Sequence, residues 1–461
     1  MNIELSTLTL PNKLRSVRHA LGGNNFRMRA RNTMTFVILA AALSQPSWAQ
    51  DFEQEPISYG KTAPLNRFSQ LLERLEAGKT QLDYEPHFGY LRSLLGELKV
   101  PESSQVLVFS KTSLQRQRIS PRTPRALYFN DDIYIGFCQQ GEVLEVSAVD
   151  PQLGAVFYTI QQEPSDRPRV VRQSDNCLIC HASSQTKGVP GHLVRSVFAD
   201  SFGMPILAAG TYRVDHMTPL EHRWGGWYVT GTHGAQKHLG NLAISGGQVP
   251  NPIDNTAGMN VTDLATRLDT SAYLTGHSDL VALMVLEHQT DAHNLITQAN
   301  FSTRQASHHQ DALNRELNEP ADRVWESTRT RIKSACEPLV EYLFFSGETQ
   351  LTHPVQGTSG FAQQFVQQGP RDKHGRSLRD LDLKTRLFRF PCSYLIYSPS
   401  FNALPGEAKG YVLQRMWEIV AGEDTSKQFA HLTPDDRRAI REIVRDTIPN
   451  LPNFWQTDTG Q

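Results

Sequence analysis

The sequence predicts an α+β protein in which an antiparallel, strand-rich half precedes a mainly α-helical half. Three observations predict this order. Short β-rich runs separated by turn residues fill positions 106–160. Apolar residues at helical spacing dominate from residue 278 onwards. A loop containing Pro, Asn and Gly at 251–260 lies between the two patterns, so we expect domains at 50–255 and 256–461.

The strand-rich half opens with two expected helices. Apolar residues at i, i+3, i+4 and i+7 predict the first between Asn66 and Leu75, and a second group of leucines predicts another over 91–98. The strand runs follow, with turn signals such as Gln140-Gly141 between them. They occupy 106–109, 126–129, 133–137, 143–146 and 155–160, and similar runs recur at 193–198, 205–209 and 227–230.

The second half reads as a series of helices. The longest expected helix spans 278–311, with Leu280, Leu283, Met284 and Leu295 on its apolar stripe. Further helices are expected at 321–345, 411–421 and 434–447.

The most specific motif is Cys177-Leu178-Ile179-Cys180-His181, because Cys-x-x-Cys-His is the attachment sequence of a c-type haem. Cys177 and Cys180 would bind the porphyrin covalently, and His181 would be the proximal iron ligand. The alternatives are a disulfide, a thioredoxin-like redox pair, or half of a zinc site. No second pair of Cys or His at matching spacing supports zinc, and a charged, turn-rich segment precedes the motif instead of a buried strand.

The N-terminus predicts export. Arg27, Arg29 and Arg31 precede an apolar run over 35–43, and small residues follow at 47–49, which is the layout of a secretory signal peptide over residues 1–49. We therefore expect a periplasmic protein, the compartment that covalent haem attachment requires in bacteria.

Charge and hydropathy restrict the partners. Residues 1–49 contain six Lys or Arg and one Asp or Glu, so the remainder is mildly acidic, which excludes a basic footprint for nucleic acid. No later apolar run is long enough for a membrane span. The expected partner is a redox protein or a small-molecule oxidant or reductant.

Only one Cys-x-x-Cys-His is present, so a single haem c is expected, and the ligand on its opposite face remains open. His233 ranks first as distal ligand because it lies in a glycine-flanked loop, where backbone could approach a flat macrocycle. His216, His238 and Met204 are the alternatives. Arg195, Arg213 and Arg223 are candidate partners of the haem propionates.

Three further cysteines lie apart from the motif. Among Cys138, Cys336 and Cys392 at most one disulfide could form, and the pairing is open. Cys392 precedes an apolar run, so a buried, inert thiol is the favoured interpretation.

Several longer segments carry a resemblance. The runs at 175–184, 188–197, 224–234, 379–386 and 391–398 resemble a family of exported bacterial proteins described as cytochrome c domain-containing. The resemblance implies covalent haem and export, but no particular reaction. A looser likeness of layout is to exported sensor domains that hold a c-type haem in a PAS-like antiparallel sheet.

The favoured function is a periplasmic monohaem cytochrome that transfers single electrons, an electron carrier before a haem oxidoreductase. One alternative is a haem enzyme of peroxidase or oxidoreductase type, with an open distal site and an acid-base role for His233 or His238. The other alternative is a haem-based gas or redox sensor.

Overall fold

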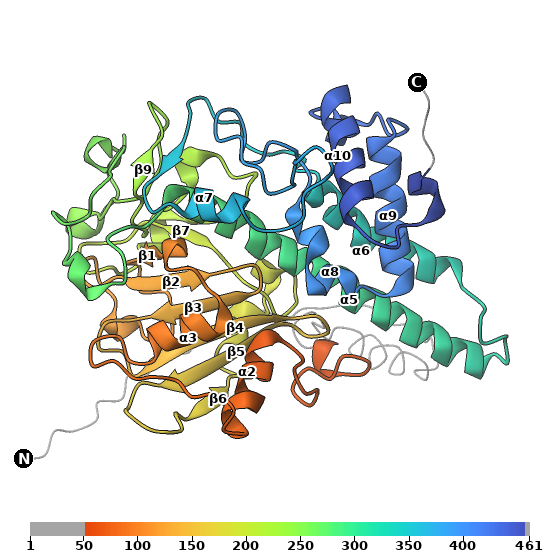
Figure 1. Cartoon of the computed structure of the whole chain (residues 1–461), viewed down its shortest axis with the longest axis horizontal. Coiled ribbons are helices and arrows are strands. Elements are labelled where there is room, and N and C mark those ends of the chain that lie inside the picture. Colours follow the sequence, from red (N-terminus) through yellow and green to blue (C-terminus); the bar gives the residue numbers. More distant parts are fainter. Residues whose placement is uncertain (1–50, 457–461) are drawn as a thin grey trace, which may run out of the picture. The chain divides into compact units, whose positions relative to one another are not determined.

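The computed structural model describes residues 51–456, so the expected signal peptide at 1–49 lies outside the described residues. The described residues belong to one compact unit. It has the predicted α+β class, with an antiparallel sheet and a set of helices (Figure 1).

The main sheet is a six-stranded meander in which each strand pairs antiparallel with the next along the chain. The predicted runs between 106 and 160 all form strands, and a sixth follows. The strands are β1 (Val106–Val108), β2 (Arg125–Phe129), β3 (Ile133–Phe137), β4 (Val143–Asp150), β5 (Gly154–Gln161) and β6 (Val170–Arg172). The Asn130 side chain forms the turn before β3, because its Oδ1 accepts hydrogen bonds from the N–H groups of Asp132 and Ile133.

One face of the sheet is covered by the two predicted N-terminal helices, α2 (Arg67–Glu76) and α3 (Leu91–Leu98) (Figure 1). A capping box between Asn66 and Ser69 fixes the start of α2. The leucines of both helices and the inward side chains of the sheet form one buried cluster. This apolar layer matches the i, i+3, i+4 pattern of the sequence.

Helix α5 (Leu280–Glu316) lies on the other face and runs through the middle of the molecule (Figure 1). It begins at Asp279, whose Oδ1 accepts from the N–H groups of Val281 and Ala282. Residues 280–297 of α5 are buried on every side. The sheet lies against one side of α5, and helices that follow α5 in the chain cover the other side.

The helices predicted at 321–345, 411–421 and 434–447 are also confirmed, as α6 (Glu326–Leu343), α9 (Gly406–Val420) and α10 (Pro434–Thr447). The structure adds two short helices that were not expected, α7 (Phe361–Val366) and α8 (Pro399–Asn402). Helix α10 has a capping box formed by Thr433 and Asp436, with Pro434 in its first turn.

Two predicted strands are wrong. Residues 205–209 end in a single 3₁₀ turn, Leu207–Ala209, between glycines at positive φ (Gly203 and Gly210) that break the extended backbone. Residues 227–230 make only isolated bridges. The run at 193–198 does contain a strand, β7 (Arg195–Val197), paired with β8 (Thr211–Arg213), and β9 (Gly231–Thr232) pairs with β10 (Gln356–Gly357).

The two halves share a core. Sheet residues such as Phe129 and Val149 lie in the same buried cluster as the side chains of α5, α6 and α9. Because the core is shared, the division into domains at 50–255 and 256–461 stays a prediction. Within residues 51–456, no helix combines the length and the apolar character that crossing a membrane requires.

Candidate haem-attachment site

The Cys-x-x-Cys-His motif forms one helical turn at the surface, directly after β6. Helix α4 (Leu178–His181) is capped by Cys177, whose carbonyl accepts from the N–H of His181 at 2.9 Å. Cys180 is exposed, Cys177 is half-buried, and neither thiol is in a disulfide. Ile179, between them, is 77% exposed. The turn therefore presents two free thiols on a surface that an apolar group could cover.

His181 is held as a neutral imidazole with one nitrogen unpaired. Its Nδ1 lies 2.9 Å from the carbonyl oxygen of Gly191, and a carbonyl can only accept, so Nδ1 carries the proton. Burial also lowers the pKa of the imidazole. Nε2 is left with a lone pair and has no hydrogen-bond partner within the described residues. A metal-binding His commonly donates its second nitrogen in this way.

The His181 ring is also positioned by packing. It lies against Phe157 of β5, with ring centroids 4.8 Å apart. The backbone N–H of Gly191 donates to the carbonyl of His181 at 2.8 Å, so Gly191 and His181 are joined by two hydrogen bonds. This role of Gly191 could not be predicted from the sequence, because the group involved is a backbone carbonyl.

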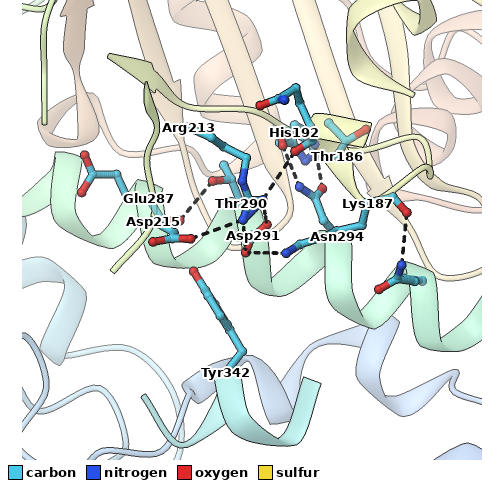
Figure 2. Close-up of polar contacts among 12 residues, drawn as sticks. Thr186, Lys187, His192, Arg213, Asp215, Glu287, Thr290, Asp291, Asn294 and Tyr342 are labelled. Carbon is cyan, nitrogen blue, oxygen red and sulfur yellow. Dashed lines mark hydrogen bonds and ion pairs between the residues drawn. The ribbon is translucent and has the colours of Figure 1, made fainter. Parts of the chain in front are cut away.

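The loop after the motif is fixed to α5. The amide side chain of Asn294 accepts from the N–H of His192 at 2.8 Å and donates to its carbonyl at 2.7 Å (Figure 2). Gln298 donates to the carbonyl of Lys187. A Cβ on Gly191 would lie 2.2 Å from Asn294 Oδ1, so only glycine fits there without movement. Helix α5 thus determines where the acceptor of His181 lies.

A buried ion-pair network supports the same loop. Arg213 binds both carboxylate oxygens of Asp291, at 2.6 and 3.0 Å, and contacts Asp215 at 3.3 Å (Figure 2). Lys187 lies 3.7 Å from Asp291. Burial raises the pKa of Asp291, and the Arg213 charge opposes that rise.

The pKa of the Cys177 thiol differs from that of an attacking thiol in a redox pair. Burial raises the pKa of Cys177 to about 11, whereas an attacking redox thiol needs a pKa lowered towards neutrality. Cys138, Cys336 and Cys392 are buried and unpaired, and Cys392 is the inert thiol expected from its apolar surroundings.

A protein-only metal site does not arise in the described part of the chain: residues 51–456 contain no group of three or more His, Cys, Asp or Glu arranged to hold an ion. A structural zinc site needs four such ligands. A porphyrin supplies four nitrogens of its own, so a single free imidazole suits haem iron.

The structure places the distal candidates in other environments. His233 Nε2 lies 3.1 Å from His238 Nε2 and also accepts from the N–H of Asn260. His216 Nδ1 lies 2.9 Å from His288 Nδ1. Met204 is an exposed turn residue. Within the described residues none of the candidates contacts His181, so the distal ligand stays a prediction.

Two of the three candidate propionate partners are already engaged. Arg223 is buried and paired with Glu287 at 2.9 Å, and Arg213 belongs to the network at Asp291. Arg195 donates only to Thr211 within the described residues. A further cation whose charge acts on both Cys177 and His181 is Arg125 of β2. The sequence could not single it out, because only strand pairing brings it there.

Comparison with protein-family models, with curated proteins and with solved structures finds no match to this chain. The class of protein therefore rests on the attachment site itself.

Proposed function

We propose that the chain is a periplasmic monohaem c-type cytochrome. The observation that carries the proposal is His181, whose Nδ1–H donates to Gly191 while Nε2 is free, on the same helical turn as two free thiols. Cys177 and Cys180 would hold the haem covalently, and His181 would bind its iron. When bound, the haem supplies one-electron oxidation and reduction.

The residues of the chain perform the remaining tasks. Gly191 and Phe157 orient the imidazole, and the clamp from Asn294 keeps Gly191 in place. The attachment turn lies at the surface, with Cys180 and Ile179 exposed. A redox protein or a small-molecule oxidant or reductant could therefore approach this edge without a large rearrangement.

The cellular setting belongs to the same proposal. Export rests on the signal-like sequence at 1–49, and membership of the cytochrome c domain-containing proteins rests on the quoted segments. The likeness of layout to PAS-type sensor domains is supported by the antiparallel sheet and by the position of the motif after its last strand.

Absorption spectra of the exported full-length chain test this proposal. The wild type is expected to show the spectrum of haem c, and the double variant Cys177→Ser, Cys180→Ser is expected to lose all covalent haem. A variant of the buried Cys138, such as Cys138→Ala, serves as the control and should retain its haem. A colourless wild type from a host that matures other c-type cytochromes would overturn the proposal.

The alternative functions need a haem whose sixth coordination position is open. Such a haem would suit a peroxidase-like enzyme or a gas sensor. Binding of carbon monoxide to the reduced protein would favour these functions, and indifference to it would favour simple electron transfer.

A further inference from the structure

An ion pair lies on the face of the sheet beside the haem motif. Arg125 of β2 and Glu145 of β4 are 2.7 Å apart, and both side chains are mostly buried. Gly136 of β3 lies between them in the sheet, opposite Glu145 in the strand register. A Cβ at Gly136 would come within 2.6 Å of the Arg125 guanidinium, so this group lies flat against the bare backbone.

Strand register connects this pair to His181. Glu145 lies opposite Thr159, and Ser147, two positions further along β4, lies opposite Phe157. Side chains two apart on a strand share a face. The Arg125–Glu145 pair is therefore next to the row of side chains on which the His181 ring packs.

Arg125 has unused donors. A guanidinium has five N–H groups, and the Nε of Arg125 is buried without a hydrogen-bond partner within the described residues. A buried donor without an acceptor destabilises the folded state. Glu145 is also shared, because its Oε1 accepts from Ser113 and Gln115.

We infer that Arg125 binds a propionate group of the haem, and this inference rests on the proposed function. The carboxylates of a haem are its two propionates, and the two oxygens of either one fit the fork of a guanidinium. The Nε of Arg172 is likewise buried without a partner within the described residues, but both of its terminal NH groups already donate to the backbone carbonyls of Thr62 and Tyr59. Because Gly136 has no side chain, the guanidinium can lie close to the backbone of the sheet, which would leave space for the edge of the haem.

Resonance Raman spectra of the holoprotein test the contact through the propionate-bending band, together with the reduction potential. Arg125→Gln is expected to shift the band and to lower the potential, since a cation near the haem favours the reduced form. Gly136→Ala keeps the charge but displaces the guanidinium, and is expected to shift the band as well. Arg329→Gln, which removes an exposed arginine of α6, should change neither.

These spectra distinguish failure of the proposed function from failure of the inference about Arg125. A wild type without covalent haem refutes the proposed function, and the inference fails with it. A haem-containing wild type whose band is the same in Arg125→Gln and in the control refutes the inference alone, even if the potential falls. If Arg125→Gln fails to fold or to attach haem, the band of Gly136→Ala decides.

Discussion

At the scale of single residues, the protonation of His181 follows from its partner. A carbonyl acceptor at Nδ1 fixes the tautomer with a free Nε2, and burial disfavours the imidazolium that would compete with metal binding. Cys177, Cys180 and His181 could be singled out from sequence, because the motif is defined by their side chains. Gly191 and Arg125 could not, because one acts through its backbone and the other reaches the site only through β-pairing.

Substitution of Gly191 tests this positioning. Gly191→Ala places a Cβ 2.2 Å from Asn294 Oδ1, so we expect the loop to shift and the free energy of unfolding to fall by about 1 to 3 kcal/mol, as when buried hydrogen bonds are lost. Urea denaturation measures the loss. Gly410→Ala, in α9 with open space around its Cβ, is the control and should stabilise by up to about 1 kcal/mol. Equal effects of the two substitutions would contradict the account.

At the scale of elements, α5 joins the haem motif to the helical half. Its first half is buried throughout and carries polar side chains that bind the loop after the motif, among them Asn294 and Asp291. The helix itself could be predicted from its apolar spacing. Its polar contacts could not, since an amphipathic pattern predicts a solvated polar face, whereas here that face meets the 183–192 loop.

Removal of the Asn294 amide tests the clamp. Asn294→Ala leaves the N–H and the carbonyl of His192 without partners, so we expect faster hydrogen exchange at the amides of Gly191 and His192. Gln305→Ala, on the same helix, removes an amide without a hydrogen bond within the described residues and is the control. Unchanged exchange in Asn294→Ala would show that the loop is held by other contacts.

At the scale of the whole molecule, an unusual number of buried histidines makes the fold sensitive to acid. Burial lowers the pKa of each of them: His181, His192, His216, His233, His238, His288 and His293. Below the ordinary histidine pKa of 6.5 the unfolded chain binds these protons and the folded chain does not. Stability should therefore decrease as the pH falls from about 6.5.

His288 provides the specific test, because burial lowers its pKa to about 3. Between pH 6.5 and 3 it should contribute about 1.4 kcal/mol of lost stability per pH unit. In His288→Gln the loss between pH 7.5 and 5 should be smaller by that contribution, even if the variant is less stable at pH 7.5. His374→Gln, at an exposed position, should follow the wild type. Parallel pH profiles for all three proteins would contradict the assignment.

The α+β class and the meander were also predictable at this scale, because alternation and turn residues are strong signals over 106–160. The shared core was not, since sequence shows where a pattern changes but not whether α5 packs on both sides of that change. The strands expected at 205–209 and 227–230 failed because short apolar runs lack the length that distinguishes strand from loop.

If Cys177 and Cys180 carry one haem, as we propose, the peptide that contains both of them will retain it. Trypsin cleavage after Arg172 and Lys187 releases residues 173–187, which include the whole motif. From full-length chain exported in a host that attaches haem c, mass spectrometry should find this peptide with one haem bound through both cysteines. Recovery of the peptide with two unmodified thiols, beside a correctly matured control cytochrome, would contradict the account.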